Sequence, residues 1–162
     1  MPSDLLKLFQ RDLDGLKAEV SLYPDDTTLW QEVPGCPNSG GTLVLHLVGN
    51  LRHFIGAQLG GTGYVRHREA EFSTRGLSRE ELLELVASAR AEVSGALETL
   101  DPAVLATTYP LALGDQSLPT GLFLMHLAVH LAFHLGQIDY HRRAATGDRT
   151  SAGVISPMVL AG

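Results

Sequence analysis

HLAVHLAFHLGQIDYH, at residues 126–141, places four histidines among leucine, alanine, valine and phenylalanine residues. His126, His130, His134 and His141 are separated by 4, 4 and 7 positions. At 3.6 residues per turn, a helix projects all four into one band about 80° wide. The other side chains are apolar enough for a protein core. The stretch therefore predicts a packed helix that carries one stripe of imidazoles.

Four segments, including this one, show the apolar periodicity of helices that pack through one face. They cover residues 3–23, 40–61, 79–100 and 119–146. Four such helices predict an all-α fold, a four-helix bundle with a single core. We expect one domain over residues 1–147 and a C-terminal tail at 148–162.

Capping residues support these boundaries. Asn38 or Ser39 precedes the second segment and suits a helix N-cap. Ser78 and Glu81 have the spacing of a capping box at the start of the third segment. Gly147 follows the fourth segment and is typical of a helix stop.

Composition narrows the class of protein. The chain has 162 residues and a net charge of −6, which argues against a nucleic-acid-binding surface. Cys36 is the single cysteine, so no internal disulfide can form and a reducing cytoplasm is favoured. The first residues lack the apolar run of a signal peptide, and no run of 18 apolar residues predicts a membrane span. We expect a cytoplasmic protein that binds neither nucleic acid nor a membrane.

The second segment carries a polar line of its own. His46, Asn50 and His53 lie at offsets of 0, 4 and 7, beside apolar residues. In a bundle, this line and the stripe at 126–141 can meet. Neither line contains a glutamate, so a ferritin-type di-iron site is not predicted.

Histidines in these positions admit two interpretations. A single histidine on an apolar face is more often a hydrogen-bonded core or rim residue, and this applies to His53 and His126. His141 lies near a helix C-terminus, where a cation suits the helix dipole. His130 and His134 differ, because two imidazoles one turn apart can bind one metal ion. With His46 as a third ligand, they match a catalytic metal site that keeps one position open.

Two motifs resemble those of the DinB-like family, also called the DinB/YfiT-like metalloenzyme family. They are LVLHLVGNLRHFIGAQLGG, residues 43–61, and LFLMHLAVHLAFHLGQIDYHRR, residues 122–143. The family pattern has a histidine early in helix two and H...H.GQ on the last long helix, matched here by His130, His134 and Gln137. The resemblance covers roughly residues 4–146. It implies a four-helix bundle of the DinB/YfiT-like type, up-up-down-down or related.

The resemblance also implies chemistry. Carried over residue by residue, the ligands of a divalent metal ion, zinc or nickel, are His46, His130 and His134. Relatives include thiol transferases, so S-transferase chemistry with a low-molecular-weight thiol is the leading hypothesis. The alternatives are a metal-dependent hydrolase and a non-catalytic metal-binding bundle. No catalytic residue can be named. The candidates for contacts to the ligands or the substrate are Asn50, His53, His126 and Gln137.

Two features outside the histidine lines carry further predictions. The connection at 61–77 contains Arg66, Arg68 and Arg75, so we expect the substrate cavity near this loop and an anionic cosubstrate. The tail is uncharged after Arg149. Its apolar side chains predict a homodimer in which the tail folds back or crosses to the partner. These side chains are Val154, Ile155, Met158, Val159 and Leu160.

Overall fold

The computed structural model describes residues 2–112, 114–153 and 155–160, without the side chain of Val159. Its helices are α1 (Pro2–Ser21), α2 (Asp26–Leu29), α3 (Gly40–Leu51), η1 (Arg52–Ala57), α4 (Arg68–Ser73), α5 (Arg79–Glu98), η2 (Pro102–Ala106), α6 (Thr120–Thr146) and η3 (Pro157–Leu160). These residues form no β-strand, only an isolated bridge between Thr108 and Pro119. The predicted all-α class is confirmed.

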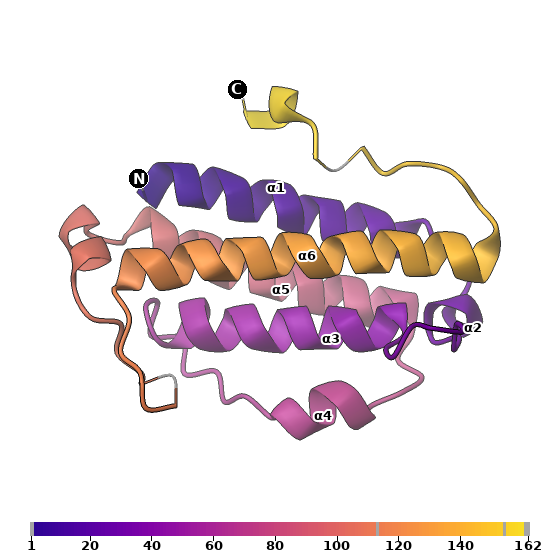
Figure 1. Cartoon of the computed structure of the whole chain (residues 1–162), viewed down its shortest axis with the longest axis horizontal. Coiled ribbons are helices and arrows are strands. Elements are labelled where there is room, and N and C mark those ends of the chain that lie inside the picture. Colours follow the sequence, from indigo (N-terminus) through magenta and orange to yellow (C-terminus); the bar gives the residue numbers. More distant parts are fainter. Residues whose placement is uncertain (1, 113, 154, 161–162) are drawn as a thin grey trace.

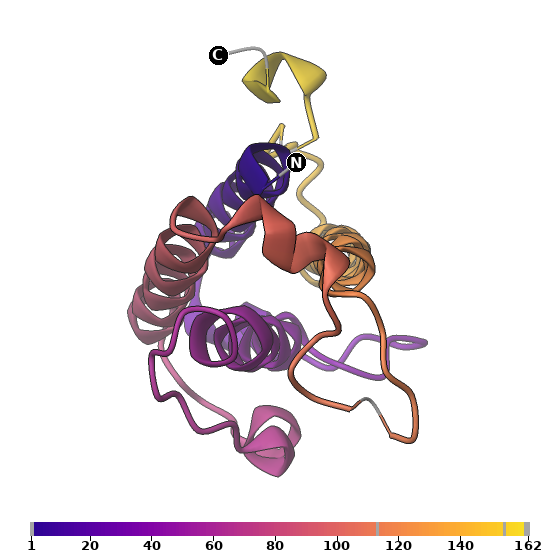
Figure 2. The same ribbon diagram turned by 90° about the vertical axis from the view of Figure 1, so that its left-hand side faces the viewer.

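Four long helices make up the helical core: α1, α3 with η1, α5 and α6. Viewed end-on, they surround one interior, with α1 beside α5 and α6, and α3 beside the same two helices (Figure 2). α1 and α6 run in one direction, and α3 and α5 run in the other (Figure 1). The chain thus follows an up-down-down-up order, where up-up-down-down or a related order was expected. α4 lies outside the core, against α3.

The interior is built from the predicted apolar stripes. Spacings of three and four residues place one side chain per turn on the same face of each helix. The buried residues include Leu5, Phe9, Leu13, Leu16 and Val20 of α1, Leu82, Val86, Ala89, Val93 and Leu97 of α5, and Leu124, Leu127, Leu131, Leu135 and Ile138 of α6.

The predicted capping residues are confirmed. Ser39 caps α3 by accepting a hydrogen bond from the backbone N–H of Thr42. Ser78 and Glu81 form the capping box of α5. Gly147 follows α6 with a φ of 73°, the left-handed conformation that favours glycine after a helix.

The second segment departs from the prediction of one continuous helix. It changes from α-helix to the π-helical segment η1 at Arg52. Gly56 lies in η1 where a Cβ would be 2.8 Å from the Glu92 carboxylate of α5, so glycine permits this close packing. The connection between the first two predicted segments contains α2, and the connection at 61–77 contains α4.

Two polar residues near the end of α6 are buried. Arg142 is 0% exposed and donates from Nε to Glu19, at 2.7 Å. His141 bonds to the Tyr23 hydroxyl through Nδ1 and to the Gln31 carbonyl through Nε2. Burial lowers the pKa of His141, although the bond to Gln31 raises it. His141 is therefore a neutral core residue, and its predicted role as a cation at the helix end is wrong.

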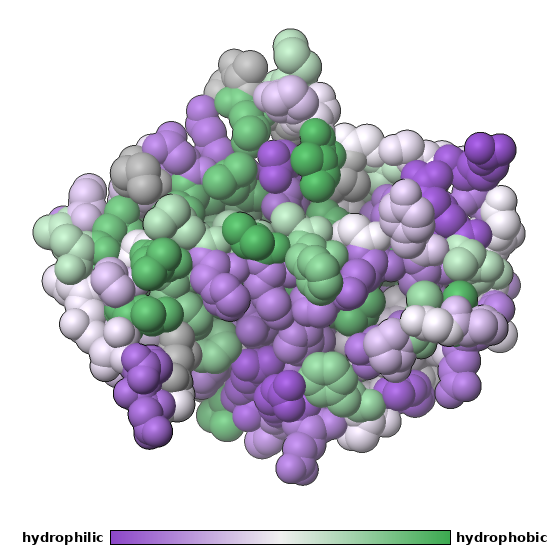
Figure 3. Space-filling view, in the orientation of Figure 1, coloured by the Kyte–Doolittle hydropathy of each residue, from purple (hydrophilic) through white to green (hydrophobic). Residues whose placement is uncertain are grey.

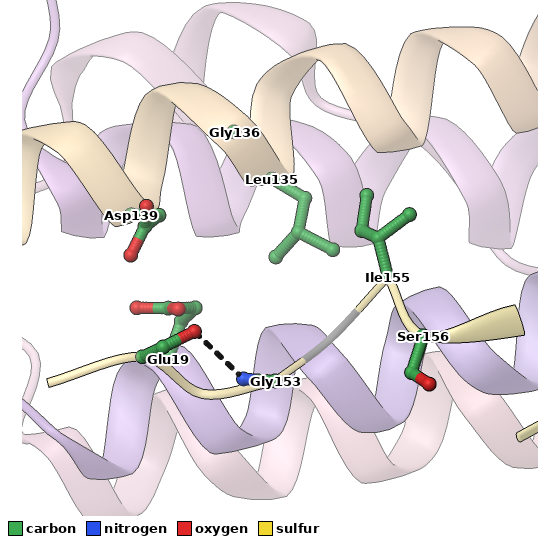
Figure 4. Close-up of a pocket in the computed structure, with 8 residues that line it drawn as sticks. Glu19, Leu135, Gly136, Asp139, Gly153, Ile155 and Ser156 are labelled. Carbon is green, nitrogen blue, oxygen red and sulfur yellow. Dashed lines mark hydrogen bonds between the residues drawn. The ribbon is translucent and has the colours of Figure 1, made fainter. Parts of the chain in front are cut away.

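The tail folds back over its own helices. Arg142 and Arg143 donate to the carbonyls of Thr150 and Arg149, each at 2.7 Å. η3 then contacts α1 (Figure 1). A cavity of about 420 Å³ lies between the tail and the core, lined on the core side by Glu19, Leu135, Gly136 and Asp139 (Figure 4). The predicted tail residue Val154 and the side chain of Val159 lie outside the described residues. The division into a domain and a tail stays a prediction.

α6 keeps an apolar face outside the core. Its exposed large side chains are Leu122, Met125, Val129, Phe133 and Tyr140, spaced so that they share one side of the helix. In the space-filling view, apolar side chains gather along the line of α6 beside a hydrophilic area (Figure 3). Among the described helices, α6 alone has the length and composition of a membrane span. An 18-residue window of this helix has a mean hydropathy of 1.4, and 33% of the window is buried inside the protein.

Candidate metal centre

Three histidines converge between α3 and α6. These helices are antiparallel neighbours, so the second turn of α3 lies level with the middle of α6 (Figure 1). The Nε2 atom of His130 is 3.3 Å from that of His46 and 3.1 Å from that of His134. The three side chains offer ligand atoms that all lie within 4.8 Å of one another. The predicted convergence of the two histidine lines is confirmed.

The hydrogen-bond partners determine where the imidazole protons lie. His46 Nδ1 is 3.0 Å from Oε2 of Glu71, and an ionised carboxylate only accepts, so this nitrogen carries the proton. His134 Nδ1 is 2.6 Å from the carbonyl oxygen Oε1 of Gln137 and donates in the same way. Both histidines therefore direct a lone pair from Nε2 toward His130.

This arrangement has more lone pairs than protons. A neutral His130 has one N–H and satisfies at most one of the two neighbouring lone pairs. Its Nδ1 atom is buried and has no hydrogen-bond partner among the residues that the structure describes. A divalent cation accepts three imidazole lone pairs at one point, so the donor set fits a metal ion.

Burial keeps the imidazoles of His130 and His134 neutral. It lowers the pKa of His130 to about 4, and a positive charge on His134 or His46 lowers this pKa further. Burial also lowers the pKa of His134, although the bond to Gln137 raises it. Near pH 7 both side chains are therefore in the neutral form that binds metals.

The other four predicted site residues have different surroundings. Gln137 contacts His134 directly, as described above. Asn50 is buried one turn after His46, and within the described part of the chain its Oδ1 atom has no hydrogen-bond partner. His53 lies on η1 with its ring 4.7 Å from that of Phe54.

The fourth residue, His126, lies farther from the ligands. It is exposed, and its ring centroid is 6.2 Å from that of His130. No hydrogen bond links Asn50, His53 or His126 to the three converging histidines in the part of the chain that the structure describes.

Glu71 is a site residue that sequence reasoning missed. It lies on α4, is 6% exposed, and accepts hydrogen bonds from both His46 and Arg66. Burial raises the pKa of the Glu71 carboxyl, but the hydrogen bonds from Arg66 and His46 and the charge of Arg66 outweigh burial and leave this pKa below its ordinary value. The short helix α4 has no apolar periodicity, so no pattern in the sequence pointed to Glu71.

A cavity of about 250 Å³ adjoins the histidines on one side. Its lining includes His134, Gln137 and Tyr140 of α6 together with the loop around Cys36. This cavity does not lie beside the 61–77 loop, where it was predicted. A second cavity of about 240 Å³ does lie beside that loop, with Gly49, Tyr64 and Glu71 in its lining, but its lining residues include none of the three converging histidines.

The arginines of the 61–77 loop are engaged within the protein. Arg66 binds Glu71, and Arg75 donates to the carbonyls of Phe72 and Thr74. Arg68 lies over the ring of Phe72, 5.1 Å from its centroid. Because Arg66 is paired with Glu71, it does not support the prediction of an anionic cosubstrate.

The family relationship agrees with this geometry. The family model of the DinB superfamily matches residues 8–138, most of the chain. This chain belongs to the DinB superfamily. The matched range of this DinB superfamily chain includes His46, His130, His134 and Gln137. No curated protein and no solved structure matches the chain.

Proposed function

We propose that this DinB superfamily protein is a divalent-metal-dependent enzyme that transfers a low-molecular-weight thiol to an electrophilic substrate. His46, His130 and His134 would hold the metal ion, zinc or nickel. The observation that carries the proposal is the convergence of their three Nε2 atoms. We also infer that the helical core is the four-helix bundle of the DinB/YfiT-like type. Its four long helices, each packed against two of the others, support this inference.

A metal ion at this centre would supply one function. Held by neutral imidazoles, it retains its positive charge and lowers the pKa of a bound thiol or water. The protein contributes the remaining parts. Gln137 holds His134 in orientation through the bond to Nδ1, and the adjoining cavity of about 250 Å³ offers space for a small substrate. Hydrolysis by an activated water is the second candidate, because the same centre would activate either nucleophile.

Elemental analysis and a reaction screen test the proposed function. We expect the purified protein to retain about one zinc or nickel ion per chain, as a three-imidazole site requires. In the screen, low-molecular-weight thiols are combined with electrophilic acceptors, and ester and amide substrates are supplied without thiol. Consumption of thiol and acceptor together supports the transferase, and thiol-independent cleavage supports the hydrolase. A protein that neither retains nor takes up a divalent ion would refute both.

We further propose that a second copy of this chain covers the apolar face of α6. This face carries no charged residue from Thr120 to Ile138, so two copies can pair without bringing like charges together. The 27-residue helix is about 40 Å long, which gives antiparallel partners an extended seam. Val129 is 68% exposed and lies near the middle of this face.

Light scattering tests this dimer. The wild type is expected to have twice the mass of one chain at micromolar concentration, and Val129→Glu is expected to shift it toward the monomer, because the substitution buries a charge in the seam. Ala87→Glu, at an exposed position of α5, is the matched control and should leave the mass unchanged. A monomeric wild type, or a monomer that binds lipid vesicles through this face, contradicts the proposal.

A further inference from the structure

The short helix α4 contacts the metal centre from outside the helical core. Its Glu71 reaches Nδ1 of His46, the nitrogen that points away from the other two histidines. Its Phe72 ring lies 5.0 Å from the His46 ring, centroid to centroid. α4 therefore touches a single ligand of the centre, on the side opposite the converging nitrogens.

Arg66 holds the Glu71 carboxylate from the other side. Its Nε atom donates to Oε1 at 2.6 Å, and its NH2 group donates to Oε2 at 2.9 Å. A two-point contact between a guanidinium and a carboxylate restricts both the position and the rotation of the carboxylate. The Oε2 atom that accepts from His46 is consequently fixed in place.

Gly49 provides the space that Glu71 occupies. A Cβ atom at this position of α3 would overlap Oε1 of Glu71, and the carboxylate would have to move. Gly49 lies three residues after His46 on the same side of α3, so the missing side chain admits the carboxylate next to the histidine. A glycine inside a helix lowers helix stability, and here the close approach of Glu71 gives a reason for its presence.

We propose that Glu71, seated against Gly49 and held by Arg66, is a positioning residue that keeps His46 in the Nδ1–H form, and that it thereby sets the affinity of the centre for a divalent cation. The statement about the tautomer of His46 concerns the metal-free protein alone. The statement about the affinity for a divalent cation rests on the proposed metal function. A carboxylate that accepts from the distal nitrogen of a histidine ligand fixes the tautomer and the ring orientation. Loss of such a partner typically weakens metal binding by about 10- to 100-fold.

Glu71→Gln is the most informative substitution, because it preserves size and removes the charge. The glutamine has one carbonyl oxygen to offer to both Arg66 and His46. If the carbonyl faces Arg66, the amide nitrogen faces His46 and donates to Nδ1. His46 then carries its proton on Nε2, where it blocks the metal ligand. Gly49→Ala is also expected to disturb the Nδ1–H form of His46 and to weaken metal binding, because the added Cβ displaces the Glu71 carboxylate.

Two measurements test the inference. Imidazole nitrogen NMR of the metal-free protein reports the tautomer of His46, which we expect to be Nδ1–H in the wild type and largely Nε2–H in Glu71→Gln. Competition with a chromophoric chelator reports zinc affinity, which we expect to fall about 10- to 100-fold in Glu71→Gln and in Gly49→Ala.

The chain offers matched controls for both variants. Glu92 forms an ion pair with Arg52, at 2.6 Å, without touching a converging histidine. Gly95 lies in α5, where an added Cβ meets no atom of the described residues within 4 Å. Glu92→Gln and Gly95→Ala should leave the His46 tautomer and the zinc affinity unchanged, with circular dichroism confirming that each variant is folded.

The outcomes separate this inference from the proposed function. An unchanged tautomer in a folded Glu71→Gln variant overturns the inference, whatever the metal affinity. A zinc affinity reduced equally by Glu92→Gln also overturns it, because the effect would then be general. A wild type that binds no zinc refutes the proposed function, while the tautomer measurement still decides the role of Glu71.

Discussion

Replacing His130 with alanine is expected to abolish retention of the metal ion. His130 is the central member of the cluster, since its Nε2 atom lies next to both other Nε2 atoms. The two remaining imidazoles would hold an ion weakly. The fall in metal affinity should exceed the roughly 10- to 100-fold fall that follows removal of a hydrogen-bond partner of a ligand. Elemental analysis after dialysis and the zinc-dependent rise in melting temperature both measure it, because a ligand at 100 times its Kd stabilises by about 2.7 kcal/mol.

His126→Ala is the matched control for this prediction. The residue lies one turn earlier on the same helix, is exposed, and is not a member of the converging group. It should retain both the ion and any thiol-transfer activity. Full activity of His130→Ala in the presence of a chelator would show that the metal mechanism is wrong.

Replacing Arg142 with methionine is expected to lower the free energy of unfolding by about 3–5 kcal/mol. The substitution leaves Glu19, which is 2% exposed, without its cationic partner in the core. It also removes the bond that ties Thr150 of the tail to α6. A loss of this size is a large part of the roughly 5–15 kcal/mol that stabilises a typical domain. Urea denaturation of the metal-free protein measures it.

Arg90→Met is the control, because Arg90 pairs with Asp14 on the surface and both side chains are well exposed. Exposed pairs contribute about 0–1 kcal/mol, so this variant should unfold near the wild-type urea concentration. The double variant Glu19→Leu with Arg142→Met should recover most of the stability, since no charge is then left unpaired. Equal losses in Arg142→Met and Arg90→Met would contradict the role assigned to the buried pair.

Features that depend on neighbouring residues could be predicted from the sequence. Ser78 and Glu81 cap α5 as their spacing indicates, because a capping box needs only one turn of chain. The change to a π-helix at Arg52 was not predicted. Gly56 in this segment packs against Glu92 of another helix, and the sequence of the segment itself carries no mark of that contact.

The same division applies to the centre. His130 and His134 share a face because helix geometry is local, and the polar line on the second segment pointed to His46. Gln137 is three residues from His134 and was likewise predicted as a contact.

Glu71 joins His46 from 25 positions away, through a short helix whose docking depends on Gly49 and Arg66. His141 is neutral and buried because Tyr23 and Gln31 meet it from distant segments. The periodicity of the chain therefore determined the helices and the three converging histidines. Only tertiary packing decided which groups surround those histidines and on which side the cavity lies, since such contacts join segments that the sequence does not place together.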